Sequence, residues 1–342
     1  MRFYLLDAAR GFAAICVVLF HLYSGTLIIE NFFLFVDFFF VLSGFVLAPS
    51  VSKLSGARQI RKFIWNRFVR LFPMAYSALF VVIFIQLTVN LKYRIAGEML
   101  SNSIPLDPLT ILASILFLQV FSANSQLLLY PLWSLSSEWL ANLFASLISF
   151  LSMSKKIALF ILPGFFFIGL SITIEVNPDL QNLTNQIGRG LLGFGLGLLV
   201  WKLKDRFLLP TRQLLLITIS IAAPILAFYV NYISLFTGMF LSPILFSFSI
   251  LTLYRLEICI NLNSAKNICR YLGKTSYGIY VWHVVATNIV SLLSKNIGWR
   301  IFEPQILHGI PRLTLVLIIT ICLTEVVLRL IEVPIRKKLS YV

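Results

Sequence analysis

Two residues whose types allow chemistry stand out in the first apolar stretch of the chain, Arg10 and His21. They are eleven residues apart. In an α-helix this is about three turns, so the two side chains share one face about 16 Å apart along the axis. A neutral imidazole can act as a general base or a nucleophile, and a guanidinium group binds phosphate. The spacing predicts a helix that carries a reactive group and an anion-binding group on one side.

Ionisable side chains inside apolar stretches are costly and are therefore functional candidates. Two plainer interpretations stay open: His21 could only bond a neighbouring helix, and Arg10 could only mark the inner end of its helix. Asp7 precedes Arg10 by three residues, the spacing of a helical ion pair. We expect Arg10 near the cytoplasmic end of the helix and His21 beyond the middle of the membrane.

Two carboxylates lie in other apolar runs. Asp37 falls in VDFFFVLSGFVL at about the depth of His21, so it could orient the imidazole as the acid of a catalytic triad does. The alternative is a pair with some other helix, since a buried carboxylate needs a partner. Glu138 falls in PLWSLSSEWL beside Trp133 and Ser136, where a polar network for helix packing is the alternative to a catalytic role.

Arg67 and Arg70 stand three residues apart just before Pro73. This spacing places both on one face at the cytoplasmic mouth, where Arg10 is also expected. Three converging guanidinium groups would form a phosphate site, because each can bind phosphate through two donors. The alternative is that they serve only the positive-inside topology.

The remaining histidines and the cysteines indicate no further site. His283 lies among Tyr277, Tyr280 and Trp282, which we interpret as aromatic belt residues at a membrane boundary, with His283 structural. His308 is given no role. The four cysteines show neither a disulfide framework nor zinc spacing, so we expect no metal.

The composition requires a membrane protein. Hydrophobic residues make up 59% of the 342 residues and charged residues 12%, about half the charged share of soluble chains. About 20 apolar residues span a bilayer. We therefore predict an all-α, polytopic transmembrane bundle of about ten helices in a single domain, residues 1–342, without a fused soluble domain. The predicted spans are 6–26, 30–49, 71–91, 130–150, 157–175, 186–202, 211–230, 234–254, 275–294 and 312–332.

The charge distribution predicts the orientation. The net charge is +15, and most of the 28 Lys and Arg residues fall in alternate loops, which places both termini in the cytoplasm. This topology explains the basic excess, so nucleic acid is not an expected partner. The apolar stretch 109–121 is short for a span and would invert the later loops if it crossed. We expect it to be a re-entrant or surface element on the outer side.

The stretch 188–197, GRGLLGFGLG, is rich in glycine but follows no strand, so a nucleotide loop is not indicated. Gly193 and Gly197 form a GxxxG pair, which favours close helix packing.

Six segments in order resemble the membrane-bound acyltransferase-3 family, the bacterial polysaccharide O-acyltransferases. They are LDAARGFAAICVVLFHL, VDFFFVLSGF, RFVRLFP, LWSLSSEW, LGKTSYGIYVWH and EVPIRKKL. The resemblance implies ten transmembrane helices, acyl-CoA as donor, a catalytic His21 and donor binding by Arg10, Arg67 and Arg70. Glu138 matches the first acidic position of the family's WSLSxE segment, but the second is here Trp139, and a frequent histidine before Leu-Trp is here Pro131.

The expected reaction moves an acyl group from cytosolic acyl-CoA to a hydroxyl of a carbohydrate or lipid-linked glycan at the bacterial inner membrane. The expected acyl group is acetyl. The donor is a co-substrate, and no permanently bound cofactor is expected. Because His21 must be neutral, activity should fall below about pH 6 to 6.5. The competing hypothesis is a transporter or flippase for an acylated or anionic solute, although neither halved repeats nor paired interrupted helices support it.

Overall fold

A computed structural model of the chain describes residues 2–23, 27–96, 108–121, 128–174, 177–206, 212–297 and 309–339. All regular elements within these ranges are helices, and they contain no strand. The chain forms two compact units: Met1–Trp65 with Ser137–Tyr277, and Asn66–Ser136 with Gly278–Val342. The prediction of an all-helical membrane bundle is confirmed, whereas the single-domain organisation stays a prediction.

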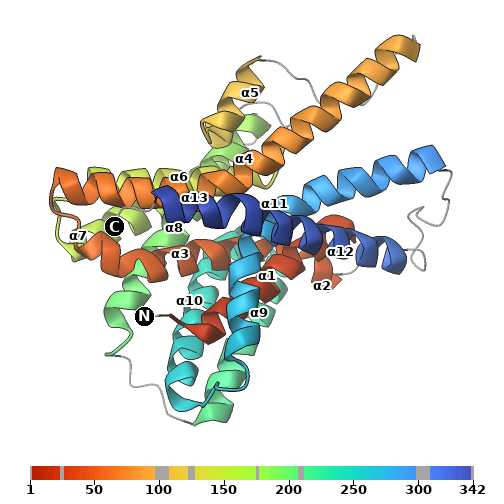
Figure 1. Cartoon of the computed structure of the whole chain (residues 1–342). Coiled ribbons are helices and arrows are strands. Elements are labelled where there is room, and N and C mark those ends of the chain that lie inside the picture. Colours follow the sequence, from red (N-terminus) through yellow and green to blue (C-terminus); the bar gives the residue numbers. More distant parts are fainter. Residues whose placement is uncertain are drawn as a thin grey trace. The chain divides into compact units, whose positions relative to one another are not determined.

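The first unit contains most of the helices (Figure 1). They are α1 (Tyr4–Leu22), α2 (Leu27–Glu30), η1 (Phe32–Leu34), α3 (Phe35–Ser52), α7 (Met153–Thr173), α8 (Pro178–Leu203), α9 (Gln213–Ile233) and α10 (Leu235–Cys259). Within this unit α8 packs against α3 and α7, and α10 packs against α9 and α3. The start of α8 is fixed locally, because the Asn177 side chain accepts from the Leu180 N–H at 3.1 Å and Pro178 follows as the first residue.

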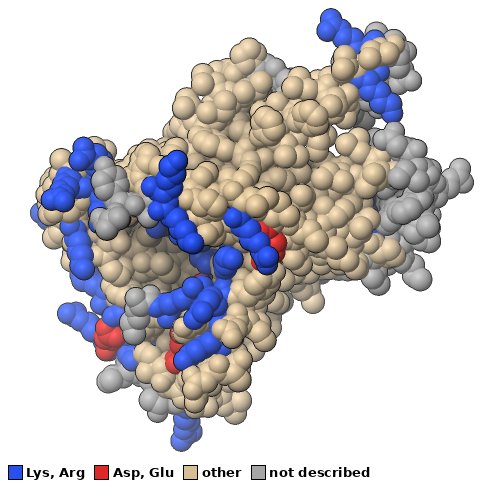
Figure 2. Space-filling view, in the orientation of Figure 1, with Lys and Arg blue, Asp and Glu red and all other residues tan. Residues whose placement is uncertain are grey.

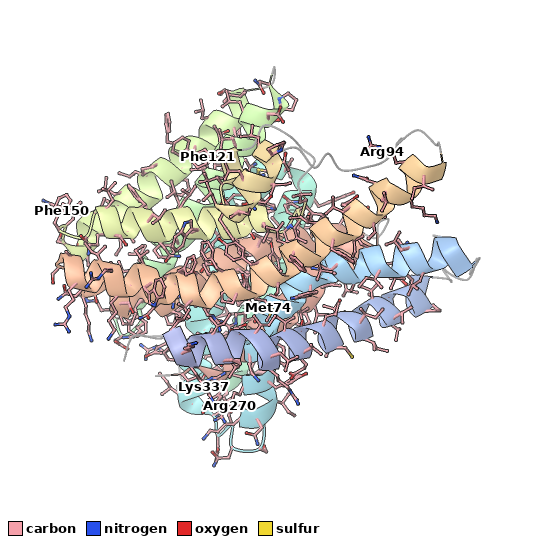
Figure 3. All side chains as sticks on the ribbon, turned by 45° about the horizontal axis from the view of Figure 1, so that its top comes forward. Met74, Arg94, Phe121, Phe150, Arg270 and Lys337 are labelled. Atoms are coloured by element: carbon pink, nitrogen blue, oxygen red, sulfur yellow. The ribbon has the colours of Figure 1, made fainter. Side chains whose placement is uncertain are left out.

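The second unit is built around the membrane part of a long helix. Its own elements are α5 (Pro108–Ile115), η2 (Gln119–Phe121), α12 (Gly309–Val327), the π-helical turn η4 (Leu328–Glu332) and α13 (Val333–Leu339). Three helices contribute residues to both units: α4 (Ala57–Ala96), α6 (Leu132–Leu147) and α11 (Lys266–Ile297). Figure 3 shows α4 running unbroken from Met74 to its end beyond Arg94.

Eight helices of the described ranges are long and apolar enough to cross a membrane. They cover Tyr4–Leu22, Ile28–Ser52, Ala57–Lys92, Met153–Thr173, Gln213–Ile233, Thr237–Cys259, Lys266–Leu293 and Pro311–Leu339. The two other predicted spans, 130–150 and 186–202, fall on α6, which has 16 residues, and on α8, whose first half is polar. The number ten and the cytoplasmic termini stay predictions.

Glycine lets α8 approach α3 closely, as the GxxxG pair predicted. A Cβ on Gly197 would lie 2.1 Å from the carbonyl oxygen of Val41, and one on Gly193 would lie 2.6 Å from Cβ of Phe40. A Cβ on Gly44 of α3 would in turn lie 2.1 Å from the carbonyl oxygen of Phe194. Backbone therefore meets backbone along this contact, and any side chain at these positions would separate the helices.

The segment 109–121 forms the short helix α5 and the turn η2, which agrees with its being too short to span. Phe117 follows α5 with φ 55° and is fully buried against the ring of Phe72, with ring centroids 4.3 Å apart. The Ser136 hydroxyl donates to the Phe117 carbonyl at 2.7 Å, and the Tyr76 hydroxyl donates to that of Ile115, also at 2.7 Å. These contacts attach the segment to α4 and to the start of α6. Its position on the outer side stays a prediction.

Candidate active site

Helix α1 carries both Arg10 and His21, and it is continuous between them. Its N-terminus is capped by another helix: the Glu257 carboxylate of α10 accepts from the Tyr4 N–H at 2.7 Å and from the Leu5 N–H at 2.9 Å. A carboxylate at a helix N-terminus satisfies free donors and complements the helix dipole. Because the helix is regular, Arg10 and His21 share a face as predicted.

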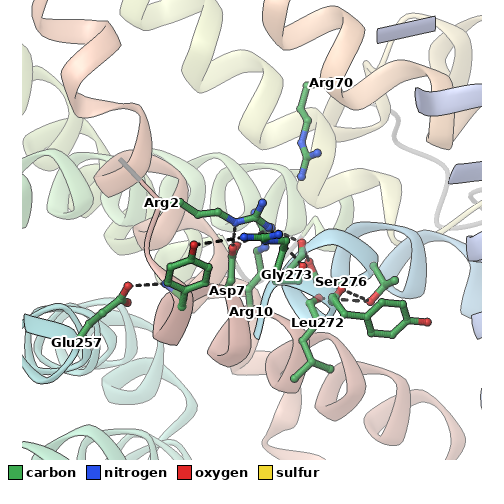
Figure 4. A network of polar contacts seen from close by, with 12 residues as sticks. Arg2, Asp7, Arg10, Arg70, Glu257, Leu272, Gly273 and Ser276 are labelled. Atoms are coloured by element: carbon green, nitrogen blue, oxygen red, sulfur yellow. Dashed lines mark hydrogen bonds and ion pairs between the residues drawn. The ribbon is translucent and has the colours of Figure 1, made fainter. Parts of the chain in front are cut away.

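The predicted Asp7–Arg10 pair is present. Arg10 Nη2 lies 3.2 Å from Asp7 Oδ1, and Arg2 Nε donates to Asp7 Oδ2 at 2.7 Å, so this carboxylate joins two arginines (Figure 4). Arg10 Nη2 also donates to the carbonyl oxygen of Gly273 on α11. Arg10 is half-buried, and its guanidinium group holds α1 against α11.

Two glycines make this contact between α1 and α11 possible. A Cβ on Gly11 would lie 2.6 Å from Cβ of Leu272, and one on Gly273 would lie 2.3 Å from Asp7 Oδ1. The Arg-Gly of the first helix and the Leu-Gly-Lys of α11 therefore fit one another, because each glycine admits the other helix's side chain. The two segments are far apart in the sequence, yet they pack against each other at this contact.

His21 lies in the last turn of α1 and is exposed. Its ring packs edge-on against Phe20, with ring centroids 4.8 Å apart. An exposed imidazole at a helix end is accessible to a substrate. Its role in the reaction stays a prediction.

Asp37 has partners other than the predicted one. Arg189 Nε of α8 donates to Asp37 Oδ1 at 2.8 Å, and the Ser242 hydroxyl of α10 donates to Oδ2 at 2.7 Å. The Asp37 side chain is fully buried and that of Arg189 is 7% exposed. Both carboxylate oxygens are thus engaged away from His21, which supports the alternative of a pair with another helix. Sequence analysis assigned no role to Arg189 and did not predict this pair.

A row of rings connects the buried pair with the histidine. The Arg189 guanidinium carbon lies 5.5 Å from the centroid of the Phe33 ring. Phe33 and Phe20 are 5.7 Å apart between ring centroids, and Phe20 contacts His21. A cation over an aromatic face is an attractive arrangement, and it gives Phe33 a defined position. The Asp37–Arg189 pair therefore supports the end of α1 through packed rings.

Glu138 lies on α6 and is half-buried. One of its carboxylate oxygens accepts from the Ser43 hydroxyl of α3 at 2.8 Å. One turn further along α6, Asn142 donates through its side chain to the Glu138 backbone carbonyl at 2.9 Å. Helix α3 therefore carries one predicted acid, Asp37, and binds the other, Glu138, through Ser43.

Arg67 and Arg70 lie on α4, and both are half-buried. Arg70 Nη1 is 3.4 Å from Glu332 Oε1 in η4, and the same oxygen accepts from Arg336 Nη1 at 3.0 Å. Glu332 is 3% exposed, so a buried carboxylate is shared by two arginines. Sequence analysis assigned no role to Glu332. Arg10 belongs to the other unit, and convergence of the three arginines stays a prediction.

His283 is buried on α11, in agreement with a structural role. Its Nδ1 lies 2.8 Å from the Tyr280 carbonyl oxygen, and its Nε2 lies 3.5 Å from the Tyr130 hydroxyl. The interpretation of its neighbours as belt residues is wrong for two of them. Tyr280 is 6% exposed and bonds Ser134 at 2.6 Å, and Trp282 is 2% exposed and donates to the sulfur of Met74. These rings pack inside the second unit.

The part of the chain that the structure describes contains no group of His, Cys, Asp or Glu residues suited to a metal ion. His308 lies outside the described residues.

These helices, with ionisable groups inside apolar spans, define a multi-pass membrane protein. The family model described as the acyltransferase domain, acyltransferase-3, matches residues 3–329, and the chain belongs to this family. The resemblance found from the six sequence segments is confirmed.

Two relatives are similar over most of this chain. One, from Bacillus subtilis (strain 168), is named "Putative peptidoglycan O-acetyltransferase YrhL" and is 27% identical over 97% of this chain and 54% of its own length. The chain thus spans about half of that relative. The other, from Acidianus two-tailed virus, is named "Putative acetyltransferase ORF330" and is 24% identical over 84% of both chains. No solved structure matches the chain significantly.

Proposed function

We propose that this protein transfers an acyl group from cytosolic acyl-CoA to a hydroxyl of a carbohydrate or cell-surface glycan precursor. The acyl group that we propose is acetyl. The observation that carries the proposal is the unbroken helix α1, with Arg10 engaged at one end and an exposed His21 at the other, in a chain of the acyltransferase family. Names of both relatives contain acetyltransferase, which supports acetyl as the group. The location proposed is the bacterial inner membrane.

In this proposal Arg10, Arg67 and Arg70 bind the phosphates of the donor. Guanidinium groups suit this task because they donate in a planar fork that matches phosphate oxygens. The pantetheine arm has roughly the length of the interval from Arg10 to His21, about 16 Å. The thioester could therefore reach His21 while the phosphates stay at the cytoplasmic end.

His21 then removes the proton from the acceptor hydroxyl as its oxygen attacks the thioester carbonyl. The new C–O bond forms, the C–S bond breaks, and the thiolate of coenzyme A takes up a proton. In the second version His21 attacks first, holds the acyl group on its ring nitrogen and passes it to the hydroxyl. Both versions require the neutral imidazole, which fits the exposed ring at the end of α1.

The two predicted acids take different roles. We propose that Asp37 acts through Arg189, Phe33 and Phe20 as a positioning residue for His21, because both of its oxygens are engaged elsewhere. One oxygen of Glu138 accepts from Ser43, and we propose that the other contacts the acceptor hydroxyl. Neither role requires a metal ion.

The experiment uses the purified protein in vesicles, with radiolabelled acetyl-CoA outside and glycan acceptor fractions inside. Transfer of label to glycan, lost in His21→Ala, supports the enzyme. Uptake of an acylated or anionic solute without covalent transfer would instead support the transporter hypothesis and overturn the proposal.

A further inference from the structure

A cluster of cations surrounds one aromatic ring at the N-terminal end of α1. The Lys266 ammonium nitrogen lies 5.8 Å and the Arg270 guanidinium carbon 6.0 Å from the centroid of the Tyr4 ring. Arg270 Nη2 is also 3.5 Å from the Tyr4 hydroxyl, and Arg2 Nη2 donates to the Arg270 backbone carbonyl at 3.3 Å. We call Arg2, Tyr4, Lys266 and Arg270 the Tyr4 cluster. All four belong to the first unit.

The nearby carboxylates balance only part of the charge of this cluster. Glu257 is engaged by the Tyr4 and Leu5 backbone N–H groups. Asp7 is shared between Arg2 and Arg10, both visible beside it in Figure 4. Arg270 and Lys266 therefore have no carboxylate within ion-pair distance among the described residues. Basic side chains also predominate over acidic ones on the surface drawn in Figure 2.

Lys266 and Arg270 both approach the Tyr4 ring, so their like charges repel and an anion beside them would be stabilising. Arg270 is exposed, which leaves its donors accessible, whereas Arg2 already donates through Nε to Asp7 and through Nη2 to the Arg270 carbonyl. The Tyr4 hydroxyl adds a neutral donor on the same side. The Arg270 guanidinium fork and the Tyr4 hydroxyl form a set of donors that suits the oxygens of a phosphate group. The Lys266 ammonium group, which donates to Asn263 Oδ1 at 2.7 Å, adds a further positive charge.

We propose that the Tyr4 cluster is a phosphate-binding site, separate from the predicted site of Arg10, Arg67 and Arg70. Two sources can supply the phosphate at a membrane surface. One is the nucleotide end of coenzyme A, and this version rests on the proposed function. The other is the headgroup of an anionic phospholipid, which is attracted to basic residues beside a transmembrane helix.

The test variant is Arg270→Gln, because Arg270 is exposed and contacts only Tyr4 and the Arg2 side chain in the bonds described here. The matched control is Arg329→Gln in η4. Arg329 is 76% exposed and pairs with Glu325 four residues earlier, so this change removes the same charge at another surface position. Both proteins are reconstituted at full length in nanodiscs, and thermal unfolding verifies that each is folded.

The first arm measures binding of coenzyme A, dephospho-coenzyme A and 3′,5′-ADP by calorimetry in nanodiscs of zwitterionic lipid. If the cluster binds the 3′-phosphate, Arg270→Gln weakens coenzyme A and 3′,5′-ADP by about 5- to 10-fold, the effect of one charge-assisted hydrogen bond, and leaves dephospho-coenzyme A unchanged. The second arm compares nanodiscs with and without phosphatidylglycerol. If the cluster binds a headgroup, the rise in Tm caused by phosphatidylglycerol shrinks in Arg270→Gln only.

Either result supports a phosphate site and identifies its source. The proposal is overturned if Arg270→Gln and Arg329→Gln behave alike in both arms. Both arms read binding rather than turnover. If the phosphate-site proposal fails, Arg270→Gln binds like the control while acyl transfer stays intact. If the proposed function fails, acyl transfer is absent while the binding results are unaffected.

Discussion

A variant of the buried Asp37–Arg189 ion pair distinguishes two roles of Asp37. The carboxylate either pairs with Arg189 or orients His21 directly. The change is Asp37→Asn, which keeps the shape of the side chain and removes its charge. In the structure it leaves the Arg189 cation, 7% exposed, without its carboxylate. The Ser242 hydroxyl still finds an acceptor in the Asn amide, so the loss is mainly that of the ion pair.

The magnitude follows from the geometry. Charges 2.8 Å apart attract by about 6 kcal/mol at an effective dielectric of about 20. Part of this offsets the desolvation of both groups, and removal of one member of a buried pair typically costs about 3 to 5 kcal/mol. We expect that loss for Asp37→Asn. Arg189→Met should cost a similar amount, and the double variant should cost clearly less than the sum.

The assay is equilibrium unfolding in mixed SDS and detergent micelles for the wild type, both single variants and the double variant. A coupling energy of about 2 kcal/mol or more is expected between the two positions. Ser242→Ala is the control, because it removes one hydrogen bond and should cost about 1 kcal/mol. Additive losses would refute the ion-pair account. A stable Asp37→Asn with strongly reduced kcat, beside a fully active Arg189→Met, would instead restore direct orientation of His21 by Asp37.

Two further predictions concern helix packing and the donor arginines. Gly197→Ala should cost about 1 to 3 kcal/mol in the same unfolding assay, because its Cβ would meet the Val41 carbonyl at 2.1 Å. The control Gly169→Ala should be neutral or slightly stabilising, because a Cβ there meets nothing within 4 Å. Equal losses in the two variants would contradict the close contact. Arg70→Ala should weaken coenzyme A binding by about 10-fold, and Glu332→Gln should strengthen it by about 2- to 5-fold because the carboxylate that competes for Arg70 is gone. Titration calorimetry measures both, and shifts of the same sign would count against a donor role for Arg70.

Periodicity and hydropathy predicted the features that depend on one helix at a time. The continuous α1 and the Asp7–Arg10 pair follow from local spacing, and length alone indicated that 109–121 is too short to span. The close approach of α8 at Gly193 and Gly197 was also predictable, because a stripe of small residues indicates a helix contact whatever the partner is.

Partner choice was not predictable in the same way. Depth placed Asp37 near His21, but the direction in which a side chain points depends on how several helices pack. The signal that could have found its partner was Arg189, a second ionisable residue within the predicted span 186–202, since a buried acid and a buried base tend to pair. Glu332 was missed for a similar reason, because its contacts with Arg70 come from distant sequence.

The aromatic residues of α11 were assigned to the wrong environment. Tyr280 and Trp282 have the composition of belt residues, yet they are buried and bond Ser134 and Met74. Composition alone does not distinguish a ring at the membrane boundary from one between helices. The hydroxyl and indole N–H settle inside because each finds a hydrogen-bond partner there.

The most direct test of the central claim is turnover of His21→Ala with acetyl-CoA and glycan acceptor, measured on folded, purified protein in nanodiscs. Because His21 is exposed, the variant should keep the Tm of the wild type and its affinity for coenzyme A. The account predicts a loss of transfer of about 100-fold or more, the contribution of a general base or nucleophile. Unaltered transfer by this variant would contradict the account.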